Sequence, residues 1–191
     1  MADDRISAAL EANTAALGEL AESHAGEMGR LALRIVEAFH GEGRLFLVGN
    51  GAQAGVAGMV ATAFQHQLDF ARPALPAVAL AHDILLAGSL GREGSGRQFF
   101  ARQLRSLAAS GDTVLVLAGD QRDEAVVDAL EAARQIGCTT VVVGTGDDDL
   151  LGAPPDFFFP LSSDSAPRTL EAQLFFGHLL CELVEKELFG V

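Results

Sequence analysis

Basic residues are scarce in this sequence, and lysine is almost absent. The 191 residues include 13 Lys and Arg against 26 Asp and Glu, which gives a formal net charge of −13, and Lys186 is the single lysine. A surface that binds nucleic acid regardless of its sequence needs clustered Lys and Arg to displace counterions from phosphate. The composition therefore argues against direct nucleic-acid binding.

Cysteines and long apolar runs are also few. Cys138 and Cys181 are the two cysteines, and they lie far apart in apolar surroundings. This pattern favours two reduced, buried thiols over a disulfide or a redox pair. The sequence shows no signal peptide and no apolar run of about 18 residues or more, so secretion and membrane spanning are disfavoured. The expected location is the cytoplasm.

The chain is long enough for a single well-cored domain, which we expect over residues 1–191. A helical arm over residues 1–41 precedes an alternating α/β body over residues 42–191. The arm is predicted to form two amphipathic helices with a break near residues 23–29. Its apolar stripes either fold back on the body or pair with a second subunit, and the absence of an evident covering segment favours homo-oligomerisation. The stripes consist of Ile6, Leu10, Leu17, Leu20, Met28, Leu31, Ile35 and Phe39.

Apolar runs separated by helical stretches make up the body. Because these runs do not alternate with polar residues, they predict strands covered on both faces, and hence a doubly wound parallel five-stranded sheet flanked by helices. Ligands of such sheets bind outside the carboxyl ends of the strands. The last helix is predicted from about Ala166 to Leu188, after a Ser- and Pro-containing cap region. The predicted strands lie in residues 45–51, 77–81, 113–119, 139–146 and 156–162.

The first strand leads into the turn Gly49-Asn50-Gly51 and then into a helix. Glycine permits positive φ and close backbone approach, and the helix directs its free N–H groups and positive dipole end at the turn. The turn therefore favours an anionic ligand. It is not a full dinucleotide fingerprint, because Ala54 stands in the place of the last glycine.

Taken together, these features resemble the SIS-domain phosphoheptose isomerases over nearly the whole chain. The resemblance rests on the glycine turn, Asp83 after the second strand, the helix before the third strand, and Glu171 and His178 on the closing helix. The chain is also similar to the related replication proteins that associate with the bacterial replication initiator. Residues 178–190 resemble the C-terminal end of those replication proteins. The resemblance implies a SIS-type fold with a two-helix arm, a sugar-phosphate isomerase activity and a homotetramer.

Most zinc ligands implied by the resemblance are missing. Family members hold zinc with a histidine and a glutamate on the helix after the glycine turn, and with a glutamine and a histidine on the closing helix. At these places the sequence has Met59, Ala63, Leu170 and His178. Zinc requires four N, O or S donors, so no metal or other cofactor is expected. The glutamate is also the family's expected proton carrier, and Ala63 cannot move a proton.

The loop after the third strand also departs from the family. Its members have a Ser-Thr-Ser-Gly-Asn-Ser loop that holds the sugar phosphate, whereas residues 118–123 read Ala-Gly-Asp-Gln-Arg-Asp. A carboxylate about 4 to 5 Å from a phosphate repels it by on the order of 4 kcal/mol per unit charge at an effective dielectric near 20. Arg122 could offset this repulsion by pairing with the aspartates or with the ligand.

The candidate catalytic residue is His178, with two alternatives: a polar group of a binding site, or a core histidine that hydrogen-bonds a neighbour. Asp83 either binds a ligand or only caps the helix that follows it. A substitute metal site at His66, His82, Asp69 and Asp83 is disfavoured because these residues share no helical face. Asp147, Asp148 and Asp149 are expected in a solvated loop. The candidate ligand-binding residues are Gly49, Asn50, Gly51, Gln53, Asp83, Asp120 and Arg122.

Two functions remain open at this point. The favoured one is a non-catalytic SIS-domain protein that binds a sugar phosphate or acts as a scaffold or regulator. The alternative is an active isomerase of sugar phosphates such as sedoheptulose 7-phosphate, which uses His178 as proton carrier without a metal and Glu93 or Asp120 as its partner. Three further possibilities stay open: the ligand is a phosphorylated sugar, the partner is a protein, and a neighbouring subunit completes the site.

Overall fold

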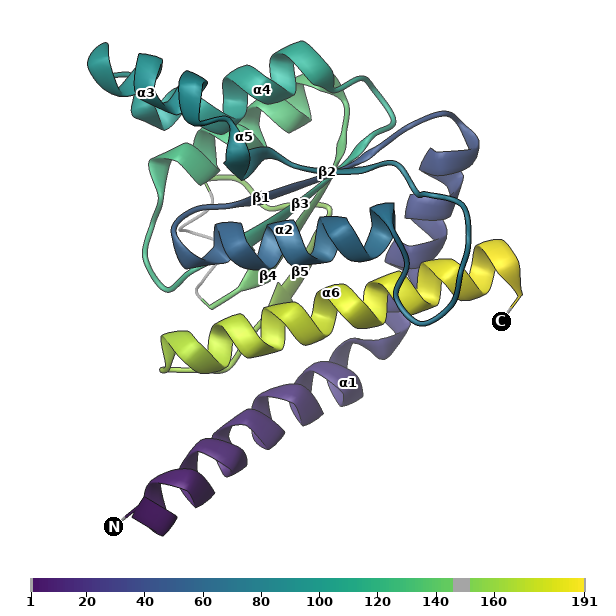
Figure 1. Ribbon diagram of the computed structural model, residues 1–191, viewed down its shortest axis with the longest axis vertical. Coiled ribbons are helices and arrows are strands. Elements are labelled where there is room, and N and C mark those ends of the chain that lie inside the picture. The colour runs from purple at the N-terminus through teal and green to yellow at the C-terminus, as the bar shows by residue number, and fades with distance from the viewer. Residues whose placement is uncertain (1, 146–151, 191) are drawn as a thin grey trace.

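The computed structural model describes residues 2–145 and 152–190, and it confirms the expected parallel five-stranded sheet. The strands lie in the order β2-β1-β3-β4-β5, and all neighbouring pairs are parallel. The carboxyl ends of all strands therefore meet at one edge of the sheet (Figure 1). The strands are β1 Leu45–Gly49, β2 Ala77–Ala79, β3 Thr113–Ala118, β4 Thr139–Gly144 and β5 Phe157–Pro160.

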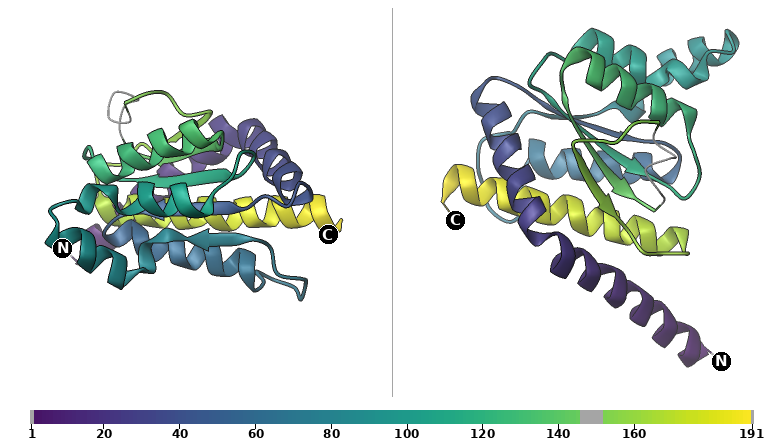
Figure 2. Two further views of the ribbon diagram at one scale, coloured as in Figure 1. Left: turned by 90° about the horizontal axis from the view of Figure 1, so that it is seen from above. Right: turned by 180° about the vertical axis from the view of Figure 1, so that it is seen from behind.

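Helices cover both faces of the sheet (Figure 2). Alternate side chains of β1 point to opposite faces, because Leu45 and Leu47 pack into one apolar cluster and Phe46 and Val48 into the other. The first cluster includes residues of α1, α2 and α6, and the second includes residues of α4 and α5. The helices are α1 Ala2–His40, α2 Ala52–Gln65, α3 Ile84–Arg92, α4 Phe99–Leu107, α5 Glu124–Ile136 and α6 Ala166–Phe189.

The predicted break in the arm is wrong: α1 is one continuous helix from Ala2 to His40. Its buried stripe runs through the region of the expected break, because Leu20 and Met28 are both buried and His24 lies between them at spacings of four residues. The His24 ring packs edge-on against Phe159 of β5, with 5.7 Å between ring centroids. The second half of the arm therefore folds back on the chain's own body, whereas Ile6 near its start is 68% exposed.

Several predicted strands are longer than those in the structure. The second strand ends at Ala79, and a short 3-10 helix over Leu80–His82 replaces its predicted end. The third and fifth strands also end before the predicted limits, at Ala118 and Pro160. Residues 147–149, predicted as a solvated loop, lie outside the described residues. The closing helix confirms its prediction to within one residue at its end.

Both cysteines are free and buried, as expected from their apolar surroundings. Burial raises the pKa of the Cys138 thiol to about 11 and that of the Cys181 thiol to about 12. The thiolate form of each is therefore disfavoured near neutral pH. Among the described helices, none combines the length and the apolar character that crossing a membrane would require.

Candidate functional site

The turn between β1 and α2 needs its glycines for steric reasons. A Cβ atom on Gly49 would lie 2.6 Å from the carbonyl oxygen of Gln53, and Gly51 has a φ of 59°. The Asn50 side-chain oxygen accepts a hydrogen bond from the Gly51 N–H at 3.0 Å. No side chain caps the N-terminus of α2, so this end of the helix keeps unsatisfied amides at the sheet edge.

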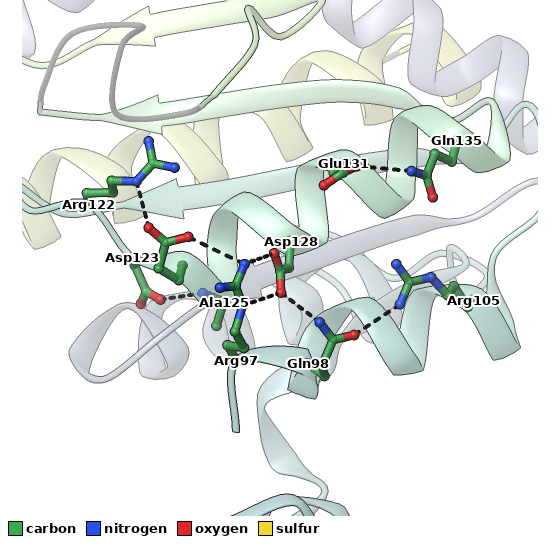
Figure 3. Close-up of polar contacts among 10 residues, drawn as sticks. Arg97, Gln98, Arg105, Arg122, Asp123, Ala125, Asp128, Glu131 and Gln135 are labelled. Atoms are coloured by element: carbon green, nitrogen blue, oxygen red, sulfur yellow. Dashed lines mark hydrogen bonds and ion pairs between the residues drawn. The ribbon is translucent and has the colours of Figure 1, made fainter. Parts of the chain in front are cut away.

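The turn between β3 and α5 is organised by Asp123. One carboxylate oxygen accepts from the Ala125 N–H at 2.9 Å and so caps α5, as Figure 3 shows. The other oxygen accepts from the Asn50 side-chain amide at 2.7 Å. Asp123 therefore joins two turns that are 73 residues apart in the sequence.

A cavity of about 530 Å³ opens at this sheet edge, between the β1 and β3 turns and the start of α6. A second cavity of about 320 Å³ shares part of its wall, including Gln53 and Thr145. The floor of the first cavity is apolar and its rim is polar, as in many small-molecule sites. The rim contains Asn50, Gln53, Asp120, Gln121, Arg122, Asp123, Glu124 and Thr145.

An ion-pair chain runs from this rim to the segment before α4. Arg122 donates to Glu124 at 2.8 Å, and the other oxygen of Glu124 lies 3.5 Å from Arg97. Arg97 in turn binds both oxygens of Asp128 at 2.6 and 2.8 Å (Figure 3). Hydrogen bonding to Arg97 lowers the pKa of Asp128, which therefore stays ionised. These ion pairs therefore connect the rim with Asp128 on α5, which is only 7% exposed.

Gln173 fixes α6 above the carboxyl ends of two strands. Its side-chain amide donates to the carbonyl oxygens of Ala118 and Val143, at 2.8 and 2.9 Å. The side chain is fully buried, and its own oxygen has no hydrogen-bond partner in the described part of the chain. The start of α6 is thereby placed so that Ala166 and Leu170 line the cavity.

The residues at the family's zinc positions are divided between the cavity and the contact of α2 with α6. Leu170 lines the cavity, and His178 lies two turns, about 12 Å, farther along α6. Met59 is 49% exposed on α2, and Ala63 is buried. His178 is half-buried and does not line the cavity, and its side chain has no hydrogen-bond partner among the described residues.

Of the predicted ligand-binding residues, Asn50, Gln53, Asp120 and Arg122 line the cavity. Gly49 and Gly51 flank Asn50 and shape the turn. Asp83 does not line the cavity; it caps α3 by accepting from the Leu86 N–H at 2.8 Å. Over residues 2–145 and 152–190, no three His, Cys, Asp or Glu side chains come together in a way that could hold a metal ion.

The sequence analysis missed Asp123 as a residue of the site, and also Thr145 at the end of β4. The Asp-Glu-Ala pattern at 123–125 is a typical start of a helix, so the cap could have been predicted. The bond from Asp123 to Asn50 could not, because it depends on how two loops lie in space. Thr145 is noticeable only in the structure, where its hydroxyl is buried without a hydrogen-bond partner among the described residues.

Comparisons with known proteins agree with this architecture. A family model described as the SIS domain matches residues 10–145. The phosphoheptose isomerase of Trichlorobacter lovleyi is 34% identical over 161 residues, which cover 84% of this chain and 82% of that protein. The structure of a phosphoheptose isomerase from Francisella tularensis superposes with a TM-score of 0.89 at 23% identity, covering 97% of this chain and 99% of that one.

A more distant structure of the same fold was solved with a phosphosugar. The Vibrio vulnificus NanR protein complexed with ManNAc-6P gives a TM-score of 0.65 at 13% identity, over 95% of this chain and 62% of that one. At this identity the likeness concerns the fold alone. Both the family model and the 34% identical isomerase match most of the chain. The chain therefore belongs to the SIS-domain family of the phosphoheptose isomerases.

Proposed function

We propose that this protein is a non-catalytic member of its family that binds a sugar phosphate in the cavity at the sheet edge, and that it acts as a binding or regulatory protein. The observation that carries the proposal is the set of apolar side chains on α2 and α6. Met59, Ala63 and Leu170 offer no zinc ligand and no proton carrier. The cavity, by contrast, keeps polar groups suited to a small hydroxylated ligand.

Isomerisation of an aldose to a ketose requires a base near the carbon next to the carbonyl group. His178 is the one titratable side chain left at the four family positions, and it lies about 12 Å along α6 from Leu170, which lines the cavity. His178 is not among the residues that line the cavity. Binding without turnover is the outcome that this arrangement supports.

The alternative function is sugar-phosphate isomerisation by a metal-free route through His178. The relationship to the phosphoheptose isomerases and the presence of His178 on α6 support it. It requires that a ligand extend from the cavity to the contact of α2 with α6. The two functions therefore differ in one observable, the appearance of product.

Phosphorus NMR of sedoheptulose 7-phosphate mixed with the purified protein, with and without zinc, separates the two functions. We expect the ligand signal to broaden without new peaks, because the cavity binds and the proton carriers are missing. New product peaks that disappear in His178→Ala would establish the alternative. A spectrum identical to the blank would instead contradict binding of this sugar phosphate.

A further inference from the structure

Several hydrogen-bond donors at and near the cavity rim are engaged by carboxylates of the chain itself. The Asn50 amide and the Ala125 N–H both donate to Asp123. Arg122 donates to Glu124, and Arg97 is bound by Glu124 and Asp128. These are the kinds of donors that bind a phosphate: a helix N-terminal amide, a side-chain amide and guanidinium groups.

Two acidic acceptors beside the cavities are left without partners. Asp120 lines both cavities and Asp164 lines the second, and neither has a hydrogen bond or ion pair to the described residues. The buried hydroxyl of Thr145 lies in the shared wall and is likewise unpartnered within the part of the chain that the structure describes. A ligand with hydroxyl groups can donate to these acceptors, whereas a phosphate dianion cannot donate and is repelled by the carboxylates.

Asp123 differs from the other acidic residues of the rim in the way it is held. Its two oxygens bind donors from two different turns, at 2.7 and 2.9 Å, much as the oxygens of a bound anion would. The carboxylate is half-buried and lines the cavity. It therefore combines a negative charge with occupancy of a side-chain amide of the β1 turn and a backbone amide in the first turn of α5.

We propose that Asp123 is a specificity-determining residue that competes, from within the chain, with anionic ligands of this cavity. A ligand phosphate binds only when the Asp123 carboxylate releases the Asn50 amide and the Ala125 N–H. The sugar part of the ligand binds without that exchange. This inference rests on the proposed function, because it takes the cavity to be the ligand site.

The test compares Asp123→Asn with the wild type. Asparagine caps a helix about as well as aspartate, so the variant removes the charge and keeps the cap. We expect the Kd for sedoheptulose 7-phosphate to fall at least about tenfold, because neutral asparagine holds the Asn50 amide and the Ala125 N–H by weaker hydrogen bonds than the carboxylate does and yields them to the phosphate more readily. The Kd for unphosphorylated sedoheptulose should stay within about twofold, since the sugar hydroxyls do not compete for these donors.

Two matched variants show whether the effect is specific. Asp83→Asn alters another aspartate cap at the same sheet edge, outside the cavity, and should leave both affinities unchanged. Asp120→Asn removes a charge from the rim that occupies no donor, and should strengthen phosphate binding less than Asp123→Asn does. An equal gain in Asp120→Asn would show general charge repulsion and overturn the competition.

A second readout uses the wild type itself. The side-chain amide signal of Asn50 and the backbone amide signal of Ala125 should shift in proton–nitrogen NMR on addition of sedoheptulose 7-phosphate, and not on addition of sedoheptulose. If the wild type binds the phosphate ester while these signals stay fixed, or if Asp123→Asn binds it no more tightly, the competition is overturned and the proposed function stands. If neither protein binds the ester, both proposals fail.

Discussion

The contact between α2 and α6 leaves no room for a side chain at Gly177. A Cβ atom built on Gly177 would lie 2.2 Å from a methyl carbon of Val60, far inside van der Waals contact. This close approach sets how far Met59 and His178, the neighbours of these two residues in sequence, can be from each other. The spacing between the family's zinc positions on α2 and α6 therefore depends on the absence of a side chain at Gly177.

Gly177→Ala should destabilise the protein by about 1 to 3 kcal/mol, because the added methyl group overpacks a buried contact and outweighs the gain in helix propensity. The measurement is urea unfolding at fixed protein concentration. Gly26→Ala on α1 is the matched control, since a Cβ there meets nothing within 4 Å, and it should stabilise by roughly 0.5 to 1 kcal/mol. If the two substitutions shift stability in the same direction, the packing argument is wrong. Adding Val60→Ala to Gly177→Ala should recover part of the loss.

At the scale of elements, one buried arginine ties α2 to α6. Arg72, in the connection from α2 to β2, donates to the carbonyl oxygens of Ala63 and Phe64 in the last turns of α2. It also pairs with Glu185 of α6 at 2.6 Å, and the two side chains are 1% and 3% exposed. The Arg72 guanidinium thus satisfies two carbonyl groups at the end of α2, and it neutralises the buried carboxylate of Glu185.

Arg72→Met should cost about 3 to 5 kcal/mol of unfolding free energy, because Glu185 is then buried without its partner. The double variant Arg72→Met with Glu185→Leu should lose less than the single variant, since no charge remains buried. A double-mutant cycle in urea unfolding measures the difference as a coupling energy. Equal stability of the single and double variants would show that Glu185 does not depend on Arg72.

Elements with strong local patterns could be predicted from the sequence, and those defined by spatial contacts could not. The five strands were predictable because their apolar runs are buried on both faces of the sheet. The continuity of α1 was not, because His24 interrupts the apolar pattern while its ring packs against Phe159. The bond between Asn50 and Asp123 is equally invisible in the sequence, since it spans 73 positions.

For the molecule as a whole, two large apolar side chains near the start of α1 are left exposed in a single chain. The helix is about 58 Å long, and its start extends past the body (Figure 2). Ile6 and Leu10 lie on one side of it and are 68% and 65% exposed. Exposed apolar side chains that gather on one side of a helix mark an interaction surface, and a second copy of the chain is the occupant that we infer for it.

We propose that this part of the arm holds an oligomer together, with four subunits as the family resemblance implies. Light scattering should give a mass that is a multiple of 19.9 kDa for the wild type. The double variant Ile6→Glu with Leu10→Glu should reduce it, because charges then replace apolar side chains at the contact. Ala8→Glu with Ala15→Glu adds the same charge on the opposite side of the helix and should keep the wild-type mass.

Two outcomes would contradict this proposal. A monomeric wild type would exclude the subunit contact, and equal masses for the two double variants would place it elsewhere. A loss of mass confined to the Ile6 and Leu10 variant, with unchanged binding of sedoheptulose 7-phosphate, would further show that the cavity of one chain is complete without a neighbour.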